Sequence, residues 1–191
     1  FATSGSVMQH MTDFLRAIEH PLLDALIDSL GGPVVLVGHS MGGMMAQEAY
    51  ARDPSRIAAL VLAFTSAAFP GGGSEFTRQF IQARIGPLDA GQSMGDVASR
   101  LMPTMRGSRS DPEAVEHARR IMSEIPPATY RKAVHLLTTF DRKADLKNIA
   151  VPTLLVAGSE DKTAPPSVME RMANEIPGST FVVLKGCGHL G

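Results

Sequence analysis

The chain has little cysteine, little charge imbalance and no long apolar run, and each shortage excludes a class of protein. Cys187 is the only cysteine among 191 residues, which excludes an internal disulfide framework. The 18 basic and 19 acidic residues nearly cancel, so nothing indicates nucleic acid or an anionic membrane as a partner. No apolar run approaches the roughly 18 residues of a membrane-spanning helix. A hydrophobic content of 44% instead predicts a globular protein with one sizeable core.

Both ends of the sequence resemble interior segments. The chain begins at Phe1 without an initiator methionine, and it stops at Gly191 directly after a predicted strand and loop. We therefore expect truncation at both ends. No targeting signal is visible, and the single cysteine fits a reducing compartment, so a cytoplasmic location is expected.

Short apolar runs alternate with amphipathic segments along most of the chain. Apolar runs predict four strands, and three-to-four spacing of apolar residues predicts helices. We expect the first strand to be buried on both faces, because it is β-branched and bordered by glycine. The alternation of strands and helices predicts a mostly parallel α/β sheet. The expected strands are 34–37, 57–64, 151–157 and 181–184, and the expected helices are 7–30, with a kink at Pro21, 41–51 and 166–175.

A helical segment interrupts this alternation between the second and third strands. Asp111 followed by proline predicts a helix start, and the pair Pro126-Pro127 predicts the end of one helix and the start of another that reaches Phe140. We divide the chain into an α/β core at 1–69, a helical cap at 70–146 and a second core part at 147–191. Most cap methionines and leucines should form helix core, and a few are candidates to line an apolar pocket, among them Met94, Leu101, Met102, Met105 and Met122. Arginines of the cap are more often solvated, but candidates for binding a substrate carboxylate are Arg78, Arg84, Arg106 and Arg109.

The strongest chemical signal is the segment Gly38-His39-Ser40-Met41-Gly42-Gly43, which joins a predicted buried strand to a predicted helix. A serine on such a sharp turn presents its hydroxyl above the sheet, while Gly38 and Gly42 allow close approach of neighbouring backbone. The N-terminus of the following helix favours developing negative charge, so the Met41 N–H is a candidate oxyanion donor. The alternatives are a phosphate-binding loop and a plain structural glycine turn, but a phosphate-binding loop would carry a lysine where Met44 and Met45 stand.

A nucleophilic serine needs a base and an acid that orients the base. His189 follows the last strand and Asp161 follows the third, so both should lie with Ser40 at the edge where parallel strands end. Glu160 is the rival for the acid, and the alternative role of Asp161 is to cap a turn. Cys187 has no comparable turn, and we interpret it as a small loop residue.

The chain resembles the α/β-hydrolase family. The resemblance lies in the serine turn, in the segment from Val151 to Asp161 and in Gly186-Cys187-Gly188-His189, and within the family it is similar to 3-oxoadipate enol-lactonases. It implies an α/β-hydrolase fold with helices on both faces of the sheet, and it favours Asp161 over Glu160. It also implies a second oxyanion donor in a loop after an earlier strand, often at a His-Gly pair, and no such segment is present. Because one such donor is worth about 10²–10³ in rate, the sequence as given is expected to be badly impaired.

These patterns predict a serine hydrolase that cleaves a small ester or lactone through Ser40, His189 and Asp161. Two alternatives stay open: hydrolysis of a C–C bond in a β-diketone by the same residues, and a non-catalytic ligand-binding role. Serine rather than aspartate at position 40 excludes dehalogenase and epoxide-hydrolase chemistry. We expect a small carbonyl compound as substrate, and neither a metal nor an organic cofactor, because serine, imidazole and water suffice for the reaction.

Overall fold

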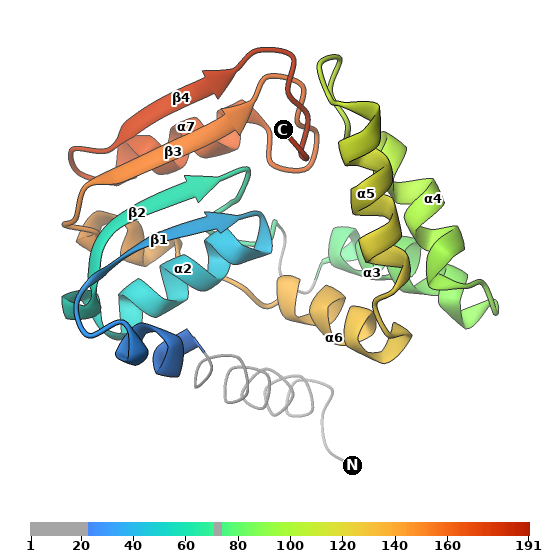
Figure 1. The fold of residues 1–191 in the computed structure, drawn as a ribbon, viewed down its shortest axis with the longest axis horizontal. Coiled ribbons are helices and arrows are strands. Elements are labelled where there is room, and N and C mark those ends of the chain that lie inside the picture. The colour runs from blue at the N-terminus through green and yellow to red at the C-terminus, as the bar shows by residue number, and fades with distance from the viewer. Residues whose placement is uncertain (1–22, 71–73) are drawn as a thin grey trace.

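The structure, a computed structural model, describes residues 23–70 and 74–191, which form a sheet beside a group of helices (Figure 1). Of the predicted helix 7–30, residues 23–29 are helical and residue 30 lies in a turn, while residues 7–22, with Pro21, lie outside the described residues. The other elements of the sheet region follow the predicted order with ends shifted by up to two residues. They are β1 (Val34–His39), α2 (Met41–Arg52), β2 (Ile57–Ala63), β3 (Thr153–Gly158), α7 (Pro166–Glu175) and β4 (Thr180–Leu184).

The four strands are all parallel and stand in the order β1-β2-β3-β4, which confirms the predicted parallel sheet. A crossover between parallel strands is right-handed in nearly all proteins. Because this strand order never reverses, the crossovers through α2 and α7 place both helices on the same face of the sheet (Figure 1). All strands also end at one common edge, which is where ligands bind in such sheets.

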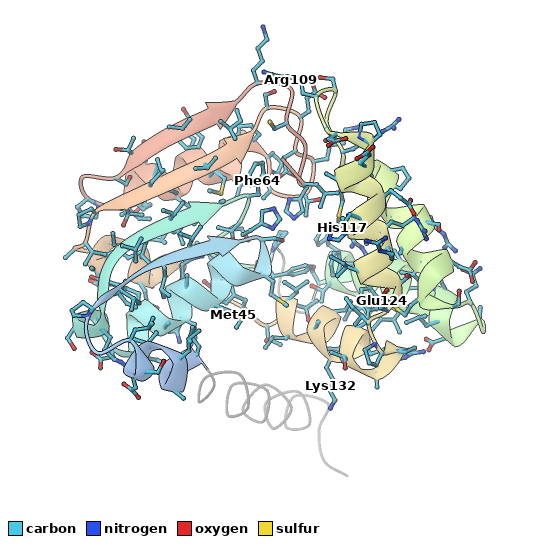
Figure 2. All side chains as sticks on the ribbon, viewed as in Figure 1. Met45, Phe64, Arg109, His117, Glu124 and Lys132 are labelled. Carbon is cyan, nitrogen blue, oxygen red and sulfur yellow. The ribbon has the colours of Figure 1, made fainter. Side chains whose placement is uncertain are left out.

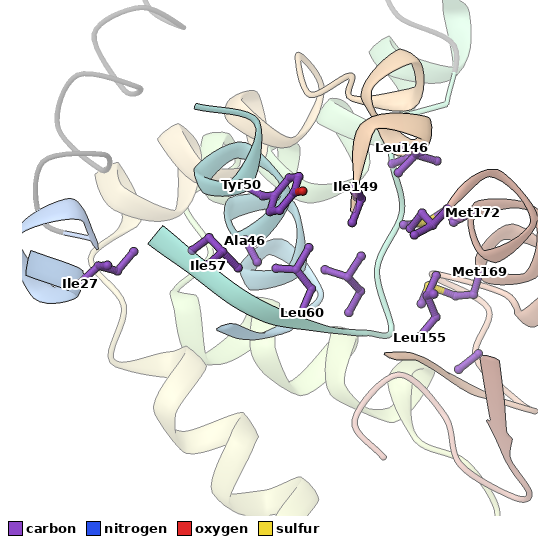
Figure 3. Packing of buried hydrophobic residues seen from close by; sticks show 14 residues of the cluster. Ile27, Ala46, Tyr50, Ile57, Leu60, Leu146, Ile149, Leu155, Met169 and Met172 are labelled. Atoms are coloured by element: carbon purple, nitrogen blue, oxygen red, sulfur yellow. The ribbon is translucent and has the colours of Figure 1, made fainter. Parts of the chain in front are cut away.

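The main hydrophobic core lies between the sheet and these helices (Figure 3). Its central side chains come from alternate positions of β2 and β3, because only every second residue of a strand faces one side. Leu62 and Leu155 are fully buried. Burying one such side chain stabilises the fold by about 1.5–3 kcal/mol. They pack in one cluster with α2 and α7 side chains that include Ala46, Tyr50, Met169 and Met172.

The opposite face of the sheet is less covered. Val35 and Val37 of β1 are 59% and 73% exposed, and Val182 and Leu184 of β4 are also exposed. The prediction that the first strand is buried on both faces is therefore wrong. In residues 23–70 and 74–191, the crossover helices α2 and α7 cover one face of the sheet. Helices were expected on both faces, and within the described residues this expectation is met for one face only.

Four helices are inserted between β2 and β3 and form a second apolar cluster of their own. The side chain of Asp111 caps α5 by accepting from the Glu113 N–H, as its sequence predicts, whereas α6 ends at Leu137 rather than Phe140. Met94, Met102 and Met122 are buried in this cluster, as expected. The separate cluster supports our proposed division into core and cap. The helices are α3 (Glu75–Asp89), α4 (Met94–Met105), α5 (Pro112–Ser123) and α6 (Pro127–Leu137).

The insertion leaves and rejoins the sheet region through two adjacent segments. The Phe69 N–H donates to the Phe140 carbonyl oxygen across 2.9 Å, and the Arg142 N–H donates to the Ala67 carbonyl oxygen across 2.7 Å. The Arg142 guanidinium also binds both carboxylate oxygens of Glu48 on α2, at 2.6 and 2.7 Å. These contacts hold the insertion beside the edge at which the strands end (Figure 1).

Candidate active site

The structure brings together the three side chains predicted to carry the chemistry. Ser40 follows β1, Asp161 follows β3 and His189 follows β4, so each lies at the carboxyl edge of the parallel sheet. His189 Nε2 is 2.8 Å from Ser40 Oγ, and His189 Nδ1 is 2.8 Å from Asp161 Oδ2. Both the imidazole and the carboxylate are buried, with side-chain exposures of 5% and 0%.

The chemistry of the groups fixes the direction of both hydrogen bonds. An ionised carboxylate only accepts, so the Nδ1–H of His189 donates to Asp161. In that tautomer Nε2 of the neutral ring is an acceptor, and the Ser40 hydroxyl donates to it. The serine proton therefore already points at the only basic nitrogen of the ring.

The surroundings of Asp161 keep its carboxyl group ionised. Burial alone raises the pKa of Asp161, but hydrogen bonds from His189 and from the backbone N–H groups of Ala164 and Thr163 outweigh burial, and the net pKa is lowered. Oδ1 accepts the two backbone bonds, at 3.0 and 2.7 Å, and Oδ2 accepts from His189. Asp161 thus does cap a turn, as the alternative interpretation held, but with the oxygen that does not contact the histidine.

The backbone of Ser40 is strained in a way that favours presentation of its hydroxyl. Its φ of 52° lies in the left-handed region, which a residue with a side chain seldom adopts. Ser40 precedes α2 in the capping position, yet its side chain makes no capping hydrogen bond. The hydroxyl is therefore free to contact His189 instead of the helix backbone.

Two glycines make this turn possible, and they are not quite the pair expected from the sequence. A side chain at Gly38 would overlap the backbone of Gly42 and Gly43, which confirms the need for glycine at position 38. A side chain at Gly42 would meet nothing within 4 Å, whereas one at Gly43 would overlap the side chain of Thr65. The backbone does approach closely at Gly42, from Gly38, but the second position with no room for a side chain is Gly43 rather than Gly42.

His39 belongs to the site, and our sequence-based assignment did not include it. Its Nε2 lies 2.7 Å from the backbone carbonyl oxygen of His189, an acceptor, so Nε2 carries the proton. Its ring also contacts those of Phe64 and His189, each with 5.3 Å between centroids. Phe64 lies at the sheet edge that faces the inserted helices (Figure 2). Although His39 keeps an exposed surface, partial desolvation of its ring lowers its pKa, so the neutral ring is favoured.

The rival candidates, Glu160 and Cys187, contact other groups. Glu160 accepts hydrogen bonds from Ser108, with distances of 2.7 Å to its N–H and 2.6 Å to its hydroxyl, rather than contacting His189. The Cys187 thiol lies 4.0 Å from the Lys185 carbonyl oxygen. The structure therefore brings Asp161, and neither Glu160 nor Cys187, to the imidazole.

Three of the four predicted carboxylate-binding arginines of the insertion contact other residues of the chain. Arg78 forms an ion pair with Glu75, and Arg84 lies over the ring of Phe80 at 5.0 Å from its centroid. The side chain of Arg109 packs beside Gly186. A carboxylate-binding role for these residues, or for Arg106, stays a prediction.

The first residue of α2 is Met41, directly after the serine. The first N–H groups of a helix have no partner within the helix and carry partial positive charge. The Met41 N–H is therefore in place to contact an oxyanion formed next to Ser40, although its participation stays a prediction. A second donor is not assigned.

Two kinds of feature are absent from the described part of the chain. Within it, no group of three or more His, Cys, Asp or Glu side chains has an arrangement suited to a metal ion. None of the helices found there combines the length and the apolar character needed to cross a bilayer.

Comparison with known proteins identifies the family of the chain. The curated pimeloyl-[acyl-carrier protein] methyl ester esterase of Nitrosospira multiformis is 25% identical over 92% of this chain and 68% of its own length. The structure of a thermophilic esterase from Thermogutta terrifontis is 29% identical with a TM-score of 0.74, covering 96% of this chain and 65% of that one. The enol-lactonase from Burkholderia xenovorans shares the fold, with a TM-score of 0.72 at 23% identity, over 86% of this chain and 62% of that one.

The chain thus spans less than two thirds of the length of these solved structures. The model of the alpha/beta hydrolase family matches residues 5–191, which is nearly the whole sequence. This match agrees with the parallel sheet, with the serine on its strained turn after β1 and with the order Ser40, Asp161, His189 along the chain. The chain belongs to the alpha/beta hydrolase family.

Proposed function

We propose that Ser40, His189 and Asp161 are the nucleophile, the base and the orienting acid of a serine hydrolase that cleaves small esters or lactones. The observation that carries the proposal is the continuous pair of 2.8 Å contacts from Asp161 through the imidazole to the Ser40 hydroxyl. A serine hydroxyl is a weak nucleophile by itself and gains reactivity when a base in hydrogen-bond contact removes its proton.

The first half of the reaction forms an acyl-enzyme. The Ser40 proton moves to His189 Nε2 while Oγ attacks the carbonyl carbon, and the carbonyl oxygen becomes an oxyanion beside the Met41 N–H. Asp161 stabilises the imidazolium and holds its tautomer. His189 then gives the proton to the leaving alkoxide oxygen, and the bond between that oxygen and the acyl carbon breaks.

The second half returns the enzyme to its starting state. Water loses a proton to His189 Nε2 and attacks the acyl carbon. The second tetrahedral intermediate collapses, the Ser40 Oγ–acyl bond breaks and the proton returns to Oγ. In a lactone the leaving oxygen remains attached to the acyl group, so the product is a single hydroxy acid.

Ester chemistry is favoured by the relatives, two of which are named as esterases. A purely ligand-binding role is less consistent with the site. The strained Ser40 backbone and the buried carboxylate–imidazole pair lower the stability of the fold, and ligand binding alone does not require either of them. C–C bond hydrolysis on the same residues and a cytoplasmic location stay predictions.

Hydrolysis of p-nitrophenyl butyrate by the wild type and by Ser40→Ala tests the proposal. We expect the substitution to lower kcat by about 10⁴–10⁶, because it removes the nucleophile. Ser167→Ala is the matched control, because Ser167 is exposed on α7. Equal kcat values for the wild type and Ser40→Ala would contradict the proposal. Cleavage of a β-diketone with no cleavage of the ester would favour the C–C alternative.

A further inference from the structure

The loop between α4 and α5, residues 106–111, contacts the segment that carries His189. The carbonyl oxygen of Met105, the last residue of α4, accepts a hydrogen bond from the His189 N–H across 2.7 Å. The Arg109 N–H donates to the Gly186 carbonyl oxygen across 3.0 Å. The inserted helices therefore bind the backbone of the histidine itself, and not only its surroundings.

The two segments pack backbone against backbone. A side chain at Gly107 would overlap the Gly186 carbonyl oxygen and the Gly188 nitrogen, and one at Gly188 would overlap the backbone of residues 105–107. Only glycine permits such an approach. Any displacement of the α4–α5 loop must therefore move the His189 segment or open a gap beside it.

A side-chain contact joins the same loop to the segment that carries Asp161. Glu160, next to Asp161 in sequence, accepts from the Ser108 N–H at 2.7 Å and from the Ser108 hydroxyl at 2.6 Å. The Glu160 N–H donates in turn to the Cys187 carbonyl oxygen at 2.9 Å, which links the acid and histidine segments directly. The hydrogen bonds from Ser108 lower the pKa of Glu160 and keep it ionised.

The other polar backbone group of His189 is held from the opposite side. Its carbonyl oxygen accepts from His39 Nε2, within the serine turn, across 2.7 Å. The N–H of His189 is thus held by the insertion and its C=O by the turn that bears the nucleophile. The position of the imidazole depends on both parts of the fold.

We propose that the α4–α5 loop is a positioning element for His189, and that the Ser108–Glu160 contact fastens this loop over the acid and histidine segments. This inference rests on the proposed function. It also gives Glu160 a role as a positioning residue rather than as the acid. Catalysis is sensitive to such positioning, because misplacing a reacting group by about 1 Å can lower a rate about 10²-fold.

The test uses a matched pair of substitutions at Glu160. Glu160→Ala removes both hydrogen bonds with Ser108. Glu160→Gln removes the charge but keeps two contacts, since its amide oxygen can accept from the Ser108 N–H while its NH₂ donates to the hydroxyl. A comparison of the two separates positioning from charge. Glu170→Ala, at an exposed position on α7, is the control for loss of a surface carboxylate.

Two measurements are made on each variant: hydrogen exchange of the His189 amide, followed by NMR, and kcat and KM for p-nitrophenyl butyrate. We expect Glu160→Ala to speed exchange of the His189 amide about tenfold and to lower kcat about three- to tenfold, with KM little changed. Glu160→Gln should recover most of both effects. Gly107→Ala should produce larger changes in the same direction, because its new methyl group displaces the histidine segment.

The exchange measurement does not depend on catalysis, so the positioning role of the loop and the proposed function can be contradicted independently. If Glu160→Ala matches Glu170→Ala in both exchange and kcat, the positioning role is overturned even where Ser40→Ala abolishes activity. If Glu160→Gln is as impaired as Glu160→Ala, charge rather than positioning is responsible, and the proposal is again overturned. If exchange responds as expected while Ser40→Ala keeps full activity, the proposed function fails and the contact between loop and histidine stands.

Discussion

The hydroxyl of Thr65 donates a hydrogen bond to the backbone carbonyl oxygen of Ser40, across 2.7 Å. Thr65 lies just after β2 and is only 2% exposed, so the strained turn after β1 is held by the neighbouring strand. The same threonine side chain fills the space beside Gly43. One side chain therefore holds the Ser40 backbone and also fills the space beside Gly43 in the same turn.

Thr65→Val removes this hydroxyl while preserving the shape of the side chain. We predict a loss of about 1 kcal/mol in the free energy of unfolding, because the Ser40 oxygen keeps other donors in the Gly43 and Met44 N–H groups. Ester hydrolysis should fall as well, because the turn is less well held. Urea unfolding and kcat measure the two effects. Thr65→Ser, which keeps the hydroxyl, should recover activity, and equal kcat values for the valine and wild-type proteins would contradict the assigned role.

Three glycines of the serine turn should respond differently to alanine. We predict that Gly38→Ala and Gly43→Ala severely lower both stability and activity, since each new methyl group overlaps atoms of the turn or of Thr65. Gly42→Ala should be well tolerated, because nothing lies within 4 Å of the added atom. Thermal unfolding of the three variants gives the ranking. A Gly42→Ala protein as unstable as the other two would show that this geometry is wrong.

Exposure along the strands predicts a strong contrast between two apolar positions. Leu62→Ala should lower the free energy of unfolding by about 2–5 kcal/mol, because Leu62 is completely buried in the main core. Val37→Thr should change it by no more than about 0.5 kcal/mol, because Val37 is 73% exposed and threonine keeps the β-branched shape. Denaturant unfolding of both variants tests the contrast, and a large loss at Val37 would indicate that this face is covered.

The lowered pKa of His39 predicts how stability depends on pH. Below the ordinary histidine pKa of about 6.5, the unfolded chain takes up a proton at this position that the folded protein does not yet bind. Acid therefore favours unfolding there, and stability rises with pH until about 6.5. We predict that His39→Gln, which keeps an N–H donor for the His189 carbonyl oxygen, makes this rise shallower. Urea titrations at a series of pH values measure the slope, and identical slopes in both proteins would refute the prediction.

Local patterns predicted much of the fold and the meeting of Ser40, Asp161 and His189. Parallel strands end at one edge, so residues that follow three of them must lie near one another whatever their separation in sequence. The helix start at Asp111 was likewise predictable, because capping depends on neighbours in the chain.

What the sequence could not predict depends on contacts between distant segments. Val35 and Val37 have the composition of a buried strand, but exposure depends on which elements cover each face. The contact of Glu160 with Ser108 joins positions 52 residues apart, and no local pattern marks it. The need for glycine at position 43 depends on the side chain of Thr65, which follows the neighbouring strand β2. His39 had one usable signal, its place directly before Ser40 in the glycine-rich turn.

The central claim is that the buried Asp161–His189 pair activates Ser40, and labelling with a fluorophosphonate tests it most directly. Peptide mass spectrometry should locate the label at Ser40 in the wild type. Labelling should slow by orders of magnitude in His189→Ala, because the base that removes the serine proton is lost. A label at Cys187 instead, or labelling of Ser40 that is equally fast without His189, would contradict the account.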